Sequence, residues 1–199
     1  NTLFISEMKG IRCLVPSFVD AIYRICTNRV KLSDVMPAEH VRRACFVILG
    51  SIISFPNQFG STKFFLQNST ATQMLVKASN YTELKPHISA ILLDTLDVET
   101  CDTNIETLLH LVFVWQYETI RDSSDFTKKS IKLILRKVKQ NIWPPNVNSS
   151  ALQSLTEMSV HFPSISKAQT VAANILDVLC RLISSMGNPC PPAQEDLVA

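Results

Sequence analysis

Glycine is scarce in this chain, with 4 residues in 199, where a soluble protein of average composition has ~7%. β-Sandwiches and β-barrels need many turn positions with positive φ, and glycine is the usual residue there. The scarcity therefore argues against those folds. It also leaves no G-x-G-x-x-G or G-x-x-x-x-G-K-[ST] pattern, so the common phosphate-binding loops are excluded.

Several other features of membrane, nucleic-acid-binding and catalytic proteins are missing. No unbroken apolar run approaches the roughly 18 residues of a membrane span, and no basic region precedes Asn1 to Ile5 as in a signal peptide. The net charge of +2 gives no long-range field that points to nucleic acid. The chain has no G-x-S-x-G, H-E-x-x-H or C-x-x-C pattern. We therefore expect no transmembrane segment, no nucleic-acid partner, no catalytic residue, no cofactor and no metal site.

The six cysteines have no metal-ligand spacing. Four of them lie in apolar helical stretches: Cys13, Cys26, Cys45 and Cys180. Free cysteine behaves as a small buried apolar residue in a reducing compartment. A chain that is 46% hydrophobic can fold without disulfides. The pattern therefore predicts buried free thiols and a cytoplasmic protein.

Apolar residues recur at steps of three and four along most of the chain, which is typical of amphipathic helices. The predicted helices cover residues 16–26, 39–55, 85–98, 104–120, 124–142, 148–161 and 166–186, with a short one at 72–78. Pro16 and Pro86 are placed in the first turns of their helices, where proline is tolerated. The 104–120 helix is apolar on nearly every side, which predicts neighbours around it and a buried, hydrogen-bonded His110.

The spacing of these helices indicates a repeat. From residue 85 onward the helices begin at intervals of about 20 residues, so that pairs recur near 40, the period of HEAT and armadillo arrays. We therefore expect an all-α fold of stacked antiparallel helix pairs, an armadillo/HEAT-like solenoid segment, over residues 1–187. A subdivision near 60–84 is possible, and a compact helical bundle is the competing arrangement.

The end of the chain has a different composition from the rest. Three prolines in residues 189–192 are incompatible with a helix. Residues 188–199 therefore read as the start of a Pro-rich linker, and we expect the chain to be a segment of a longer polypeptide.

One helix carries a basic ridge, a name we use for four residues that fall on one side of the 124–142 segment: Lys128, Lys132, Arg136 and Lys139. Ile131, Ile134, Leu135 and Val138 occupy the opposite side. The ridge could bind an acidic partner or an anionic lipid surface. The alternative is the solvated outer face of a repeat helix. No aromatic residue is interleaved with the basic ones, so the ridge offers no platform for base stacking.

The order of residues from 8 to 63 resembles a known family. Its features are Met8-Lys9-Gly10-Ile11, Leu14-Val15-Pro16, Val41-Arg42-Arg43-Ala44-Cys45 and Pro56 with Phe59-Gly60. This order resembles the helical region upstream of the catalytic domain in Ral GTPase-activating protein subunits, the tuberin-like family. Residues 91–104 and the apolar helix after them also look similar, so that the resemblance covers about residues 3–120. The 66–84 connection is shorter than the insert of the family's beta subunit.

The resemblance implies a function that the composition does not. The family's GTPase-activating domain uses an asparagine side chain, and no stretch of this chain matches that domain. The resemblance therefore implies a non-catalytic scaffold segment that mediates subunit assembly or positions the GTPase-activating domain. The implied partners are a second subunit and, through the parent protein, a Ral-type small GTPase. A helical-repeat adaptor of an unrelated signalling or transport pathway is the alternative.

Overall fold

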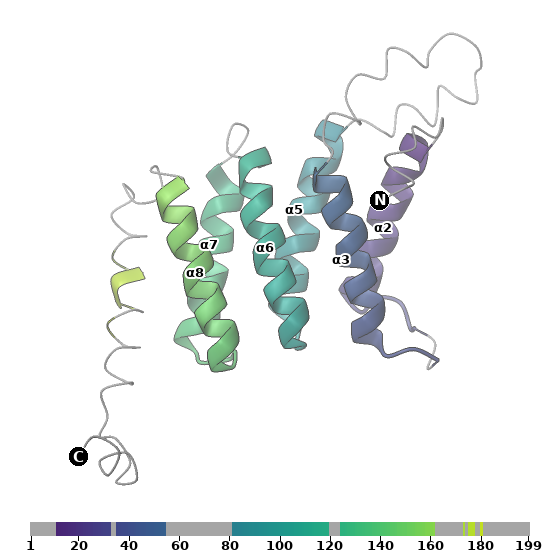
Figure 1. Ribbon diagram of the computed structural model, residues 1–199. Helices are drawn as coiled ribbons and strands as arrows, with labels where there is room; N and C mark the ends of the chain where they lie inside the picture. The colour runs from purple at the N-terminus through teal and green to yellow at the C-terminus, as the bar shows by residue number, and fades with distance from the viewer. Residues whose placement is uncertain are drawn as a thin grey trace. The chain divides into compact units, whose positions relative to one another are not determined.

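The computed structural model describes residues 11–32, 35–54, 81–119, 124–161, 173, 175–177 and 180. Within these residues the chain forms helices and no strand. The helices are α2 (Ile11–Cys26), α3 (Ala38–Ser54), α5 (Tyr81–Val98), α6 (Asp102–Thr119), α7 (Ser124–Lys139) and α8 (Pro145–His161) (Figure 1). The all-α expectation is confirmed for this part of the chain. The short helix expected over 72–78 lies outside the described residues, and the described residues of 166–186 are helical.

Two prolines lie deeper in their helices than the sequence suggested. α2 begins by Ile11 and contains Pro16, and α5 begins at Tyr81 and contains Pro86. Each proline removes one backbone donor from its helix. Pro145 instead occupies the first position of α8, where its missing N–H costs nothing. α8 therefore begins three residues before the expected start at residue 148.

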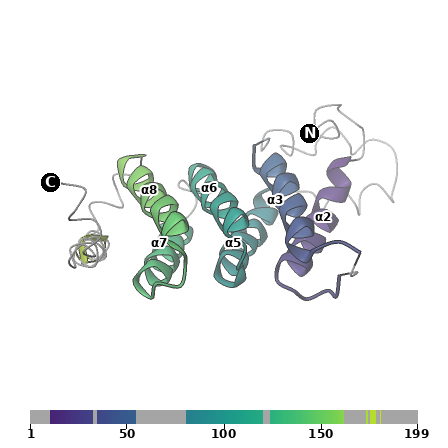
Figure 2. The same ribbon diagram turned by 60° about the horizontal axis from the view of Figure 1, so that its bottom comes forward.

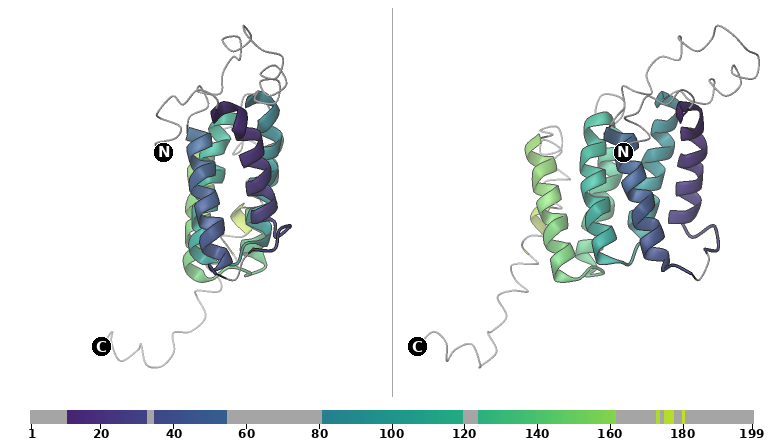
Figure 3. Two further views of the ribbon diagram at one scale, coloured as in Figure 1. Left: turned by 90° about the vertical axis from the view of Figure 1, so that its right-hand side faces the viewer. Right: turned by 45° about the vertical axis from the view of Figure 1, so that its right-hand side comes forward.

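The chain divides into two compact units, residues 1–130 and 131–199. In the first unit α2 packs against α3 and α5 packs against α6. α2 also packs against α5, and α3 against α6, so that α2 and α5 form one layer and α3 and α6 the other (Figures 2 and 3). The Tyr23 hydroxyl donates to Asp94 at 3.1 Å, which joins the C-terminal turns of α2 and α5. The two helices of each layer therefore run in the same direction.

The core of the first unit follows the apolar spacing of the sequence. On α5 the buried positions recur at steps of three and four: Ile88, Ile91, Leu92, Thr95 and Leu96. Gly50 allows α3 and α6 to approach closely, because a Cβ there would lie 3.2 Å from Leu111 Cδ2. A side chain at residue 50 would require the Leu111 side chain to move by a few tenths of an ångström.

α6 is not covered on every side as its composition suggested. His110 is exposed, so the prediction of a buried imidazole is wrong, and Tyr117 is 48% exposed. Phe113 packs edge-on against Tyr117 with ring centroids 5.6 Å apart. Edge-to-face contact between the two rings covers part of this outer stripe without a neighbouring helix.

Asparagine replaces glycine at two helix ends. Asn28 after α2 and Asn141 after α7 have φ of 57° and 53°. At the second end the Ile142 N–H donates to the Lys137 carbonyl at 3.2 Å, and the Asn141 N–H donates to the Val138 carbonyl at 3.0 Å. These two bonds form a Schellman motif, which requires a left-handed residue at its centre. Asparagine thus takes the left-handed position at the end of these two helices, where glycine is more common.

The end of α7 allows a direct test of this left-handed position. Asn141→Gly should raise the free energy of unfolding by about 0.5 kcal/mol, and Asn141→Ala should lower it by about 1 kcal/mol, because a Cβ without a local hydrogen bond is strained at positive φ. Urea unfolding followed by far-UV circular dichroism measures both changes. Equal stability of the alanine variant and the parent chain would contradict the assignment.

The second unit contains the remainder of α7, the connection 140–144 and α8. The buried apolar residues among its described part are Ile131, Ile134, Leu135, Val138, Trp143, Val147, Ala151, Leu155 and Met158. The Asn148 side chain donates to the Trp143 carbonyl at 2.9 Å, so it stabilises the turn before the helix. Asn148, at the predicted start of this helix, lies within the first turn of α8.

Candidate functional site

α7 carries the basic ridge, and its sequence explains its helical state. The helix begins at Ser124, as predicted, with Asp125 in its first turn and Arg136, Lys137 and Lys139 in its last turn. An acid at the start and bases at the end favour a helix because they interact with its dipole. Part of the positive charge of this segment therefore stabilises the helix itself.

The four ridge residues share one exposed face of α7. Lys128, Lys132, Arg136 and Lys139 are all exposed, and the opposite apolar face is buried. Lys139 Nζ lies 3.0 Å from Asp177 Oδ2, so one ridge charge already has a carboxylate partner. Lys137 is buried and does not belong to the ridge. The ridge presents a row of cations along a rigid element, a geometry that suits an extended acidic surface.

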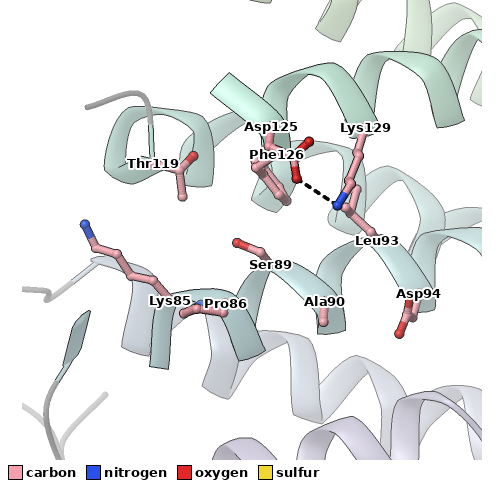
Figure 4. A pocket seen from close by; sticks show the side chains of 10 residues that line it. All are labelled: Lys85, Pro86, Ser89, Ala90, Leu93, Asp94, Thr119, Asp125, Phe126 and Lys129. Carbon is pink, nitrogen blue, oxygen red and sulfur yellow. Dashed lines mark ion pairs between the residues drawn. The ribbon is translucent and has the colours of Figure 1, made fainter. Parts of the chain in front are cut away.

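A groove of about 660 Å³ lies in the first unit beside the start of α7 (Figure 4). It is lined by Lys85, Pro86, Ser89, Ala90, Leu93, Asp94, Thr119, Asp125, Phe126 and Lys129. α5 supplies one wall, and the start of α7 with Thr119 of α6 supplies the other. The volume falls in the range of small-molecule sites, so the polar groups decide what the groove can do.

Several polar groups of the groove have partners within the chain. Lys129 Nζ lies 2.7 Å from Asp125 Oδ2 in the exposed ion pair of Figure 4. Ser89 Oγ accepts a hydrogen bond of 2.9 Å from Trp115 Nε1, and Asp94 accepts one from Tyr23. No nucleophile and base meet among these residues. The part of the chain that the structure describes also contains no group of three metal-ligating side chains.

Glu99, at the turn between α5 and α6, accepts five hydrogen bonds from the chain. Arg42 donates to both of its oxygens, from Nε at 2.7 Å and from Nη2 at 2.8 Å. The N–H groups of Thr100 and Cys101 donate to Oε1 at 2.9 and 3.0 Å. Asn104 Nδ2 donates to Oε2 at 3.3 Å. The Glu99 side chain is fully buried, so these donors replace the water that a carboxylate needs.

The surroundings of Glu99 set its ionisation. Burial alone raises the pKa of this carboxyl, but the hydrogen bonds from Arg42 and from the Cys101 and Thr100 amides outweigh burial and lower the pKa below its usual value. The same contact with Glu99 raises the pKa of Arg42. A perturbed carboxyl often marks a catalytic site. Here the Arg42 side chain of α3 bonds both carboxylate oxygens beside the α5–α6 turn, so the cluster fastens α3 to that turn.

The lowered pKa of Glu99 makes stability depend on pH. In the unfolded chain this carboxyl takes up a proton at a higher pH than in the folded chain. The stabilisation is therefore complete above the unfolded pKa of about 4.3 and is lost as the pH falls through the folded pKa. Urea unfolding between pH 7 and pH 3 should show a steeper loss for the parent chain than for Glu99→Gln. Parallel pH curves for the two chains would refute this role.

The sequence predicts the ridge, and it predicts neither the groove nor the Glu99 cluster. Glu99 directly follows the predicted 85–98 helix. Its partner Arg42 stands 57 residues earlier in sequence, and no local pattern links the two. Cys180 is exposed, so the expectation that it is buried is wrong, while Cys26 and Cys45 are buried as predicted.

Comparison with known proteins gives one distant relative that bears on function. The chain is similar to a Rap-GAP domain-containing protein of Dictyostelium discoideum, with 25% identity over 234 aligned positions. These positions cover all of this chain and 14% of that protein, so the chain spans a small part of its relative. No family model matches the chain, and no solved structure matches it significantly. The similarity relates the chain to a GAP-containing protein. Among the described residues, no helix is long and apolar enough to span a membrane.

Proposed function

We propose that this chain is a non-catalytic scaffold segment of a small-GTPase-activating protein of the Ral-type, tuberin-like kind. The observation that carries the proposal is the similarity of the whole chain to part of a Rap-GAP domain-containing protein. The scaffold mediates subunit assembly or positions the GTPase-activating domain. Its partners are a second subunit and, through the parent protein, a small GTPase in the cytoplasm.

The helices of the first unit support a repeat arrangement. Each helix pair leaves an apolar face that the next pair covers, and α2 with α5 and α3 with α6 make such contacts. We propose that these pairs continue as an armadillo/HEAT-like solenoid. An array of this kind offers long exposed helix faces, which suits a binding role better than chemistry.

The absence of converging reactive groups in the described groove and Glu99 cluster supports a non-enzymatic role. In the groove Asp125 pairs with Lys129 and Asp94 accepts a hydrogen bond from Tyr23, and the Glu99 carboxylate is occupied by five donors from the chain itself. Chemistry then belongs to another part of the parent protein.

Deletion of residues 1–187 from the parent protein tests the proposal. The deletion should abolish co-purification of the partner subunit, or lower GTP hydrolysis on the GTPase while each remaining domain stays folded. The isolated segment should show no stimulation of GTP hydrolysis. Full assembly and full activity after the deletion would overturn the scaffold role.

The basic ridge is the surface that we propose for an acidic partner. Lys132→Glu together with Arg136→Glu should weaken binding of the partner subunit by about tenfold, mostly through a slower association rate, because these exposed charges steer the encounter. Titration of the complex at increasing salt measures the effect, since added salt should weaken the parent complex and spare the variant.

Lys132→Glu alone and Lys31→Glu form a matched pair, because each makes the same charge change at an exposed site, one on the ridge and one outside it. An equal loss in Lys31→Glu would mean that net charge alone is responsible. Binding of phosphatidylserine vesicles by the parent chain and not by the double variant would assign the ridge to a lipid surface instead.

The second candidate is an adaptor of an unrelated signalling or transport pathway. It is favoured by the helix-pair packing, which many such adaptors share. Capture of the parent protein's partner subunit by the isolated segment separates the two candidates, because an unrelated adaptor has no such subunit.

A further inference from the structure

One edge of the first unit gathers four helix ends. The Tyr23–Asp94 hydrogen bond joins the last turns of α2 and α5, and the Asn104 side chain donates to the Glu39 carbonyl at 3.1 Å, which joins the first turns of α3 and α6. The α2–α3 connection and the α5–α6 turn therefore lie side by side, at the lower ends of these helices in Figure 1. We call the surface formed by residues 24–32, 35–39 and 94–104 the turn edge.

The turn edge exposes four large apolar side chains. Val35 is 93% exposed, Met36 and Val98 are about half exposed, and Val30 lies on the same connection as Val35 and Met36. Exposed apolar residues that gather on one surface mark a contact site, whereas single scattered ones do not. These four come from both the α2–α3 connection and the end of α5, so the contact site spans the two helix pairs.

The charges of the turn edge divide it into two halves of opposite sign. The α2–α3 half carries three exposed cations: Arg24, Arg29 and Lys31. The α5–α6 half carries three exposed carboxylates: Asp94, Asp97 and Asp102. Glu39 is an exposed acid in the basic half, and it acts on Arg42 of its own helix. The surface is therefore bipolar along the direction from the first helix pair to the second.

Tyr23 lies where the two halves meet. The Arg29 guanidinium lies 4.6 Å from the centre of the Tyr23 ring and donates to its hydroxyl at 3.0 Å, and that hydroxyl donates to Asp94. These two charges therefore have partners within the chain. Three others, farther from the boundary, have no ion pair or side-chain hydrogen bond with any residue that the structure describes: Arg24, Lys31 and Asp102. Their charges are available to a partner.

We propose that the turn edge binds the turn edge of a second copy of this chain. A two-fold axis places the α2–α3 half of each copy on the α5–α6 half of the other, so that cations face carboxylates twice and the apolar side chains lie between them. A surface of one charge sign would repel its own copy, and this surface carries both signs in separate halves. The inference concerns the chain itself and does not rest on the proposed scaffold role.

The size of the turn edge sets the strength of this contact. Four helix ends spaced about 10 Å apart cover about 400 Å² on each copy, half of the area that each partner buries in a standard stable interface. We therefore expect a weak dimer that forms only at high protein concentration. Sedimentation equilibrium of the full chain between about 10 µM and about 1 mM, in reducing buffer, measures it. The average mass should rise from that of the monomer toward that of the dimer.

The mass itself can contradict the proposal in two ways. A monomer mass at every concentration would exclude the contact. Growth beyond the dimer would exclude the two-fold arrangement, because an interface of this kind closes once both copies are joined.

Reversal of one charge in each half tests which surface makes the contact. Arg24→Glu and Asp102→Lys should each weaken the dimer about tenfold, because each reversal replaces two attractions in the dimer by two repulsions. An equimolar mixture of the two variants should associate as the parent chain does, since a negative residue 24 then faces a positive residue 102 and the other pair is native. A mixture that associates no better than its components would refute the two-fold pairing.

Lys128→Glu is the matched control for Arg24→Glu, because it makes the same change in net charge at an exposed site outside the turn edge. It should leave association of the chain unchanged, and it should not rescue Asp102→Lys in a mixture. Rescue by Lys128→Glu equal to that by Arg24→Glu would assign the effect to net charge and reject the turn edge.

The apolar part of the contact has a separate test. Val35→Ser should weaken the dimer about tenfold, since each dimer buries two copies of this side chain. Val47→Ser on α3 is the control, because Val47 is also largely exposed and lies outside the turn edge. Urea unfolding should be the same for both variants, so that a change in association reports the contact and not the fold. Equal association of Val35→Ser and the parent chain would contradict the proposal.

Discussion

Glu99→Gln should lower the free energy of unfolding of the first unit by about 3 kcal/mol, because it leaves Arg42 in a largely buried position without a carboxylate. Glutamine has almost the same shape as glutamate, so the loss reports charge and hydrogen bonding and creates no cavity. Its amide also brings donors toward the Thr100 and Cys101 N–H groups, which are donors themselves. Urea unfolding followed by Trp115 fluorescence in a Trp143→Phe background measures the change, since the chain has two tryptophans.

A double-mutant cycle separates the pair from its surroundings. Arg42→Met should cost about 3–5 kcal/mol, because the buried Glu99 carboxylate loses its ion pair. The double variant should lose less than the sum of the two single variants, since neither charge remains unpaired. Purely additive losses would show that Arg42 and Glu99 act independently, and would contradict the geometry of their two hydrogen bonds.

The exposed pair between Asp125 and Lys129 is the matched control. Its oxygen and nitrogen are 2.7 Å apart, the same distance as in the Arg42–Glu99 pair, but its side chains are 65% and 64% exposed. Asp125→Asn should therefore cost less than about 0.5 kcal/mol. The comparison tests whether burial, and not the distance between the charged atoms, causes the larger loss of stability expected for Glu99→Gln.

The contrast between the two ion pairs shows what sequence alone could predict. Asp125 and Lys129 are four residues apart on one helix, so their contact follows from helical spacing. Arg42 and Glu99 meet because α3 packs against α6 and places their side chains at the α5–α6 turn. That contact depends on the packing of separate helices, which the apolar pattern indicates only in outline.

The boundaries of the helices show the same division between local and tertiary effects. The start of α7 at Ser124 and the buried face of α5 followed directly from capping and apolar spacing. Pro16 and Pro86 were placed at helix starts by their intrinsic preference, and packing overrides that preference in both helices. The ridge was visible because charge on one helix face is a local property. The groove could not be predicted from a local pattern, because residues of three separate helices line it.

Trp115→Ala is the core change with the largest expected effect. Trp115 is fully buried in α6, and its Nε1 donates to Ser89 of α5 at 2.9 Å. Removal of the indole ring leaves a large cavity and one lost hydrogen bond, so we expect a loss of about 3–5 kcal/mol in the free energy of unfolding. Far-UV circular dichroism during urea unfolding measures it, since the fluorescent group of the first unit is removed.

Two variants on α6 separate cavity, hydrogen bond and surface effects. Trp115→Phe retains part of the ring volume and removes the donor, so it should cost less than the alanine variant, at about 1–2 kcal/mol. Tyr117→Ala removes an aromatic side chain from the half-exposed outer stripe of the same helix and should cost less than about 1 kcal/mol. If Tyr117→Ala were as destabilising as Trp115→Ala, another element would have to cover the outer face of α6. The distribution of the loss between these two positions therefore tests whether this face is available for a partner.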